Sequence, residues 1–217
     1  MINAVVFDFG DTLLGRAGAG AGLRDAAGRL GADVAPEVAE AVWEEIQAKA
    51  RTPQEMAKGR DLSAEAHREH WLALYGVTES IVAGLAEVLY EREISPGAWL
   101  PFPDSLPTLQ ELTARGVPIG VLSDTGFDIR PVLARHGMDR FVRSWVLSYE
   151  HGVAKPARVL FETACRELGS DPGETLMVGD SHHTDGGAIE AGMRAYLLPR
   201  PVPGEPRGLD LVLRLIG

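Results

Sequence analysis

Five side chains able to bind or attack a ligand stand at the ends of short apolar runs or in the loops between them. Asp8 directly follows the first run, and Ser123 and Asp180 follow two later ones. Asp185 comes shortly after Asp180, and Lys155 stands at the head of the helical stretch between the third and fourth runs. If the runs are parallel strands of one sheet, their carboxyl ends meet at a single edge, where open α/β folds bind their ligands. We therefore expect three carboxylates, a hydroxyl and an ammonium to converge at one point.

The apolar runs have the composition of strands that are buried on both faces. Residues 4–7 form a dense apolar run of the kind that a parallel strand covered by helices on both sides requires. We expect further strands at residues 118–122, 145–147, 175–178 and 195–198. Helical patterns lie between or after them, at residues 104–115, 128–136, 156–168 and 185–191, and residues 209–216 are expected to form a final short element of undetermined type. Alternating strands and helices predict an α/β fold with a doubly wound parallel sheet.

A purely helical block lies between the first strand and the alternating part. Helical patterns cover residues 23–30, 36–50, 63–75 and 79–90. A glycine- and alanine-rich segment, residues 15–22, has no regular periodicity, and we interpret it as a mobile connection. The block ends at Ser95-Pro96-Gly97 and has the size of a self-contained insert.

The overall composition excludes several classes of protein. The chain has 217 residues, and its formal net charge of −10 argues against nucleic acids and anionic membranes as partners. No apolar run approaches the roughly 20 residues that a membrane span needs, and the N-terminus lacks the pattern of a secretory signal. Cys165 is the only cysteine, which excludes an internal disulfide. We expect a soluble, cytoplasmic protein, monomeric or homodimeric. An anionic substrate would need a local positive patch or a metal.

Four motifs carry a resemblance to a known family. They are FDFGDTL at residues 7–13, VLSDT at 121–125, GVAKP at 152–156 and VGDSHHTDGGAIEAGM at 178–193. In order and spacing the sequence resembles the haloacid dehalogenase (HAD) superfamily, most of whose members are magnesium-dependent phosphohydrolases that work through an aspartyl-phosphate. The resemblance implies a Rossmann-like core, residues 1–14 and 97–217, with a helical cap inserted at residues 15–96.

The resemblance also implies a nucleophile and a metal site. Asp8 would attack phosphorus and split hydrolysis into transfer to the enzyme and then to water. Mg²⁺ would be held by Asp8, the backbone carbonyl of Gly10 and Asp180, since hard oxygen ligands suit this ion. Asp185 would be a further ligand or would hold a metal-bound water.

Other residues would bind the phosphoryl group. Lys155 would bridge the nucleophile and the phosphoryl group, and the hydroxyl of Ser123 would donate to a phosphoryl oxygen. Backbone N–H groups after Asp8 and after Ser123, the latter at Asp124, would add donors. Arg16 follows the first motif and would meet a substrate anion as the cap closes, unless it is a flexible surface arginine.

The first motif departs from the family pattern. Phosphatases of the family carry a second aspartate two residues after the nucleophile, which protonates the leaving group and activates water; here that position is Gly10 and the acid stands at Asp11. Acid–base catalysis is typically worth roughly 10²–10⁴ in rate. Three alternatives follow. Asp11, His182 or His183 substitutes, the substrate has a good leaving group such as an acyl phosphate, or the protein is a slow or inactive relative.

We therefore expect a Mg²⁺-dependent phosphohydrolase acting on a small phosphorylated metabolite. The alternative from another class is a catalytically weak relative that binds a phosphorylated ligand or a partner. The family's dehalogenases do not use Mg²⁺, so Asp180 and Asp185 argue against that branch. A phosphonate-cleaving activity would need a cap lysine for a Schiff base, with Lys49 and Lys58 as the only candidates.

Two smaller patterns lie in the helical block. His67 and His70 are one helical turn apart, at metal-ligand spacing, and we interpret them as part of a polar face. Trp43 and Trp71 are expected to pack between the helices, where one of them would reach a substrate pocket.

Overall fold

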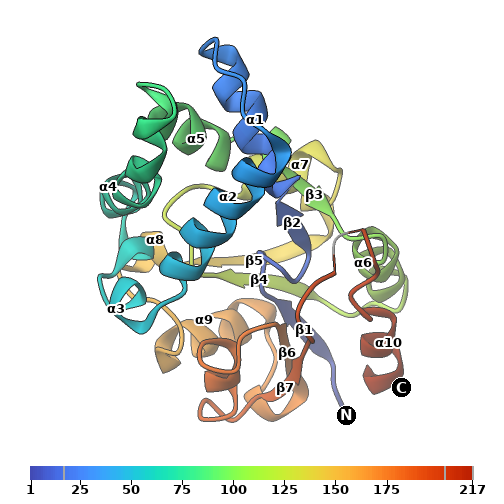
Figure 1. Cartoon of the computed structure of the whole chain (residues 1–217). Coiled ribbons are helices and arrows are strands. Elements are labelled where there is room, and N and C mark those ends of the chain that lie inside the picture. Colours follow the sequence, from blue (N-terminus) through green and yellow to red (C-terminus); the bar gives the residue numbers. More distant parts are fainter. Residues whose placement is uncertain (17, 203, 217) are drawn as a thin grey trace.

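A five-stranded parallel sheet lies at the centre of the computed structural model, which describes residues 1–16, 18–202 and 204–216 (Figure 1). The strands in chain order are β1 (Ala4–Phe7), β4 (Ile119–Ser123), β5 (Val142–Leu147), β6 (Thr175–Gly179) and β7 (Arg194–Leu197). Their order in the sheet is β5-β4-β1-β6-β7, and all four pairings are parallel. The chain therefore builds one half of the sheet, returns past β1 and builds the other. This reversal places the ligand-binding edge beside the end of β1.

Helices cover both faces of the sheet, which confirms the predicted doubly wound α/β fold. Val5 and Phe7 point into one apolar cluster and Ala4 and Val6 into another, as alternation along a strand requires. The first cluster is shared with α6 (Ser105–Ala114), α7 (Arg130–Arg135) and α10 (Asp210–Ile216). The second is shared with α9 (Arg158–Leu168), whose buried face includes Cys165. A one-turn helix, α8 (Ser148–His151), follows β5.

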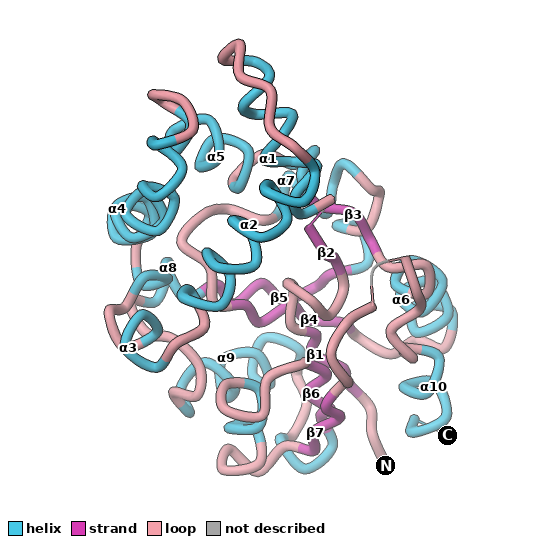
Figure 2. Tube along the Cα trace, in the orientation of Figure 1, coloured by secondary structure: helices cyan, strands magenta, loops and turns pink. Residues whose placement is uncertain are grey.

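The remaining helices form a separate unit, which we call the helical unit, over the carboxyl edge of the sheet (Figure 2). It comprises α1 (Ala19–Arg29), α2 (Pro36–Ala50), α3 (Pro53–Met56), α4 (Ala64–Tyr75) and α5 (Leu85–Glu93). Helices α1, α2, α4 and α5 share an apolar cluster distinct from the two clusters of the sheet. The division of the chain into a core and a cap at residues 15 and 96 stays a prediction.

The two segments that connect the sheet to the helical unit are more ordered than predicted. Strands β2 (Leu14–Arg16) and β3 (Trp99–Pro101) pair antiparallel there, where the glycine-rich pattern had indicated a mobile connection. A Cβ on Gly15 would lie 3.0 Å from the Phe102 ring, so glycine permits this close packing. Three-residue strands are too short to show a period of two, which is why the sequence did not reveal them. Residue 17 of that segment lies outside the described residues.

Two predicted helices are shorter than expected. The pattern at residues 79–90 resolves into a 3₁₀ turn at Gly76–Ser80 and then α5, with Gly84 at a φ of 85° between them. The pattern at residues 185–191 is a 3₁₀ turn, Asp185–Ala188, in which Gly187 lies against Pro156. Within the described residues, no helix combines the length and the apolar character needed to cross a membrane.

Candidate active site

Asp8 and Lys155 meet at the centre of the site. The backbone N–H of Asp8 continues the β1–β6 ladder by donating to the carbonyl of Val178 at 2.8 Å, which fixes the residue at the end of the strand. Lys155 Nζ donates to Asp8 Oδ1 at 2.8 Å, to Asp185 Oδ1 at 2.6 Å and to the carbonyl of Leu122 at 3.3 Å. All three donors of the ammonium are thus used on groups at the same edge of the sheet.

Burial and charge act in opposite directions on these two groups. Burial raises the pKa of Asp8 to about 8, although the adjacent Lys155 acts to lower it. Burial also opposes the charge of Lys155, but the attraction of Asp185, Asp8 and Asp124 raises its pKa well above its ordinary value. A single ammonium does not balance the acidic groups around it. The site therefore favours a further cation.

Asp180 and Asp185 complete a carboxylate cluster with Asp8. One oxygen of each of the three lies within 4.8 Å of the others. Burial, and then the nearby charge of Asp11, raise the pKa of Asp180 to about 6. Three carboxylates against one ammonium leave excess negative charge, and their hard oxygens are the ligands that Mg²⁺ prefers. The residues present fit a magnesium site.

Asp185 differs from the other two carboxylates because both of its oxygens have donors. Oδ1 accepts from Lys155, and Oδ2 accepts from the backbone N–H of Ser181 at 2.9 Å. A Cβ on Gly179 would lie 2.2 Å from the Asp185 carboxyl, so glycine is needed for this close approach. This arrangement favours the alternative in which Asp185 orients its neighbours. Its contact with a metal stays a prediction.

The second predicted motif lies against the same cavity. Ser123, the last residue of β4, is buried and lines the cavity. Asp124 Oδ1 accepts from the backbone N–H of Lys155 at 2.8 Å and so holds the lysine loop. Burial raises the pKa of Asp124 to about 6, against the opposing effect of Lys155. Substrate contacts of Ser123 and Asp124 stay predictions.

Asp11 lies at the edge of the cluster in an unusual backbone conformation. Its φ is 55°, in the left-handed region that favours glycine, although aspartate tolerates this region better than most residues. Its Oδ2 accepts from Arg51 at 3.2 Å, and its carbonyl accepts from Arg207 Nε at 2.8 Å. Gly10 has open space beside it, since a Cβ there would meet only Trp99, at 3.8 Å.

Arg16 is engaged within the protein. Its guanidinium forms a bidentate ion pair with buried Glu93 and lies over the rings of Trp71 and Trp99, at 5.4 and 4.7 Å from their centroids. Tyr75 donates to the same carboxylate. The side chain lines the cavity, but Glu93 already compensates its charge. A substrate anion would have to compete with Glu93 for the predicted contact with Arg16.

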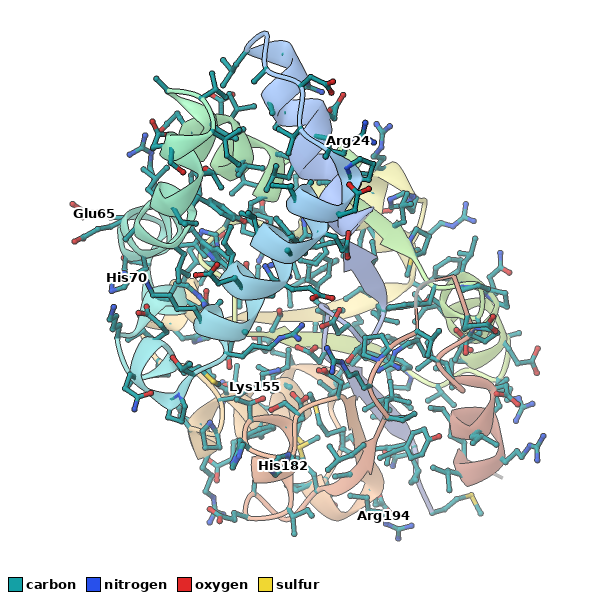
Figure 3. All side chains as sticks on the ribbon, viewed as in Figure 1. Arg24, Glu65, His70, Lys155, His182 and Arg194 are labelled. Atoms are coloured by element: carbon teal, nitrogen blue, oxygen red, sulfur yellow. The ribbon has the colours of Figure 1, made fainter. Side chains whose placement is uncertain are left out.

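The remaining candidates for proton transfer lie on the rim. His182 and His183 are exposed, with ring centroids 3.9 Å apart, and both line the cavity. Figure 3 shows His182 on the sheet side of the site, near Lys155. Among the described residues, neither forms a hydrogen bond or ion pair with Asp8, and their catalytic role stays a prediction.

Several cavity residues of the helical unit were not anticipated. They are Gln47, Arg51, Arg60, Asp61 and His67. His67 is buried, against Tyr90 and Gly126, so the interpretation of it as part of a polar face was wrong. Trp71 lines the cavity, as expected for one of the tryptophans. A single sequence carries no signal for these positions, because their placement depends on how the helices dock.

The fold and the cavity define an α/β enzyme with a carboxylate-rich site at the end of β1. The family model for haloacid dehalogenase-like hydrolases matches residues 2–192. The chain belongs to this family and is a hydrolase.

The relatives support the same assignment. The glyceraldehyde 3-phosphate phosphatase of Methanopyrus kandleri is 31% identical over 198 residues, 89% of this chain and 82% of that protein. The protein of the same name from Methanothermobacter thermautotrophicus is 33% identical over 128 residues, 58% of this chain and only 56% of that relative. Among solved structures, the HAD-hydrolase YfnB from Bacillus subtilis, described as bound to magnesium, has a TM-score of 0.75 at 18% identity, covering 100% of this chain and 99% of that one. That structure supports the fold alone.

Proposed function

We propose that this hydrolase is a Mg²⁺-dependent phosphatase that acts on a small phosphorylated metabolite through an aspartyl-phosphate on Asp8. The observation that carries the proposal is the contact of Asp8 Oδ1 with Lys155 Nζ at 2.8 Å, with a carboxylate oxygen of Asp180 within 4.8 Å of one of Asp8. The phosphatase names of the two relatives agree with it.

Asp8 has the position that a nucleophile needs. Its carboxylate oxygen forms a bond to phosphorus while the bond from phosphorus to the ester oxygen breaks, and the leaving group departs with that electron pair. Water then attacks the phosphorus and restores the carboxylate. Lys155, held by Asp185 and Asp124, places one positive charge where charge develops on the phosphoryl oxygens.

A magnesium ion would be held by Asp8 and Asp180, with the Gly10 carbonyl and Asp185 as further candidates. When bound, it would neutralise phosphoryl charge that otherwise repels a carboxylate nucleophile. The chain's own contribution is to fix these oxygens at the end of β1 and β6 and to hold Lys155 between them.

The group that protonates the leaving group has several candidates. Gly10 offers no acid, so the alternatives remain Asp11, His182 or His183, or a leaving group that needs no proton. The same observation favours the second candidate, a catalytically weak relative that binds a phosphorylated ligand. A phosphonate-cleaving function has less support, because Lys49 and Lys58, within the described residues, do not line the cavity.

A phosphatase screen of wild type beside Asp8→Asn tests the proposal. With Mg²⁺ and a panel of phosphorylated metabolites that includes acyl phosphates, we expect turnover by wild type, loss of it in Asp8→Asn and loss on chelation that added Mg²⁺ reverses. Asp139→Asn is the matched control, because this exposed aspartate lies outside the cavity. Equal background turnover in wild type and Asp8→Asn would favour the binding protein.

A further inference from the structure

Most of the positive charge in the active-site cavity is already compensated by the protein. The cavity measures about 610 Å³. Arg16 is paired with Glu93, and Arg60 donates to Asp61 from Nε and Nη2, at 3.3 and 3.2 Å, and to a backbone carbonyl. Lys155 is held by the carboxylates at the sheet edge. These three cations leave little charge for a second group on a substrate.

Three other residues that line the cavity, two of them exposed arginines, have donors without sufficient partners. Arg200 has no hydrogen bond or ion pair within residues 1–16, 18–202 and 204–216. Arg51 uses one N–H group, on Asp11, and retains its other donors. Gln47 Nε2 is buried from solvent and has no hydrogen-bond partner among the described residues. An unpaired buried amide group costs free energy, so a ligand acceptor at Gln47 would be favoured.

These three residues stand at a junction between two cavities. Gln47, Arg51 and Arg200 line both the active-site cavity and a groove of about 720 Å³ outside it, whose walls include Trp43 and Phe102. Asp11, which follows the proposed nucleophile Asp8 closely in the sequence, also lines both cavities. We call Gln47, Arg51 and Arg200 the junction donors.

Charge limits where an anion can bind along this path. At the sheet end, the carboxylate cluster accepts only a group that is bound together with a cation. In the outer groove, Glu40 and Glu44 line the wall and would repel an anion. The junction donors line both spaces, and the one carboxylate that lines both with them, Asp11, is already paired with Arg51.

We propose that the substrate carries a second anionic group, a carboxylate or a second phosphate, and that the junction donors bind it while the scissile phosphate lies at Asp8. This inference rests on the proposed function and names its substrate class. Guanidinium groups match the planar oxygens of a carboxylate or phosphate, and each such charge-assisted hydrogen bond is shorter and stronger than a neutral one.

Matched pairs of phosphate esters test the inference, because the members of a pair differ only in the second anion. Glycerol phosphate with phosphoglycerate, and glucitol phosphate with phosphogluconate, test a carboxylate at two chain lengths. Fructose monophosphate with fructose bisphosphate tests a second phosphate. For wild type we expect kcat/KM to be at least about tenfold higher for the second member of at least one pair, the size of one charge-assisted hydrogen bond.

Two variants connect that preference to the junction donors. Arg200→Gln removes the unpaired charge and Gln47→Leu removes the unpaired donor. Each should bring the ratio of kcat/KM within the preferred pair close to one, chiefly through KM, since the group bound lies away from the reacting atoms. Arg194→Gln is the control, because this exposed arginine on β7 lies at the bottom of Figure 3, outside both cavities, and should keep the wild-type ratio.

The results separate this inference from the proposed function. If wild type hydrolyses the esters with no preference in any pair, or if Arg200→Gln and Gln47→Leu keep the preference, the second-anion site is overturned and the phosphatase stands. If wild type hydrolyses none of them, calorimetric titration with the same pairs tests the site alone. Tighter binding of the second member, lost in Arg200→Gln, would support it, and equal binding would overturn it.

Discussion

Gly10 and Asp11 are the two residues at which this chain departs from the pattern of its family. The acid that normally stands two residues after the nucleophile is missing, and the following position, which has a left-handed φ of 55°, carries an aspartate that Arg51 binds. Gly10 therefore occupies the position at which the family has its acid. The acid of this chain stands one residue later, at Asp11, whose φ is in the left-handed region. Substitutions at positions 10 and 11 test whether Asp11 takes over proton transfer.

Restoring the acid at position 10 tests whether that role is vacant. We expect Gly10→Asp to fold normally, because its Cβ would meet only Trp99, at an ordinary 3.8 Å. If no other group protonates the leaving group, kcat should rise by roughly 10²–10⁴ for substrates with poor leaving groups. The measurement is kcat for an alkyl and an acyl phosphate in both proteins.

The acyl phosphate serves as the internal control, since its leaving group needs little protonation and its rate should change less. An unchanged kcat for the alkyl phosphate would indicate that Asp11, His182 or His183 already supplies the proton. The single variant Asp11→Asn, with Gly10 kept, then distinguishes Asp11 from the histidines, because its kcat for the alkyl phosphate falls only if Asp11 supplies the proton.

At the scale of elements, the contact between α4 and the loop after β4 brings the helical unit onto the sheet. Gly126 lies directly against His67 of α4. The Ser148 hydroxyl, on α8, accepts from the backbone N–H of Thr125 at 2.9 Å and donates to the carbonyl of Asp61 at 2.5 Å. Ser148 therefore links the loop that follows Ser123 to the turn at Asp61, just before α4.

Gly126→Ala should weaken this docking. The added Cβ would lie 2.1 Å from the Cβ of His67, a clash that no side-chain rotation relieves. We expect a loss of about 1–3 kcal/mol in the free energy of unfolding, as for other overpacked sites, together with a lower kcat/KM. Denaturant unfolding and steady-state kinetics measure the two effects.

Gly76→Ala is the matched control, because it lies at the end of the same helix and its Cβ would meet nothing within 4 Å. It should leave stability and kinetics close to wild type. If Gly126→Ala behaved like this control in both measurements, the close packing of α4 on the loop would be refuted.

At the scale of the whole molecule, His67 links folding to pH. It is buried between α4, α5 and the loop at Gly126, and this burial lowers its pKa to about 4, although Asp61 and Glu93 act to raise it. Arg60 and Arg16, also facing it, act in the same direction as burial. The histidine is therefore neutral in the folded protein near pH 7.

We expect the protein to lose stability as the pH falls below the ordinary histidine pKa of 6.5. Between pH 6.5 and 4 the unfolded chain binds the proton and the folded chain does not, so the free energy of unfolding decreases with falling pH. At pH 5 the loss from this residue alone is about 2 kcal/mol. Urea unfolding of wild type and His67→Gln at pH 7 and pH 5 measures it.

The informative quantity is the difference between the two proteins in their pH dependence, since His67→Gln also changes packing. A pH dependence in His67→Gln equal to that of wild type would contradict the assignment.

The sequence by itself determined the parallel sheet and the group of residues at its edge. Strand β1 is apolar on both faces and ends in Asp8, and the runs that form β4 and β6 end in Ser123 and, one residue past β6, Asp180. Because parallel strands place their carboxyl ends at one edge, local patterns were enough to bring these residues together. The four motifs then identified the family.

Only the tertiary structure decided what surrounds that edge. The β2–β3 pair, the burial of His67, the pairing of Arg16 with Glu93 and the unpaired donors at Gln47 and Arg200 depend on contacts between segments far apart in the chain. No short pattern records such contacts, because the same helix sequence can present any polar residue to solvent or to a partner. The position of the carboxylate-rich edge follows from strand direction, whereas the cavity beside it follows from how the helices dock.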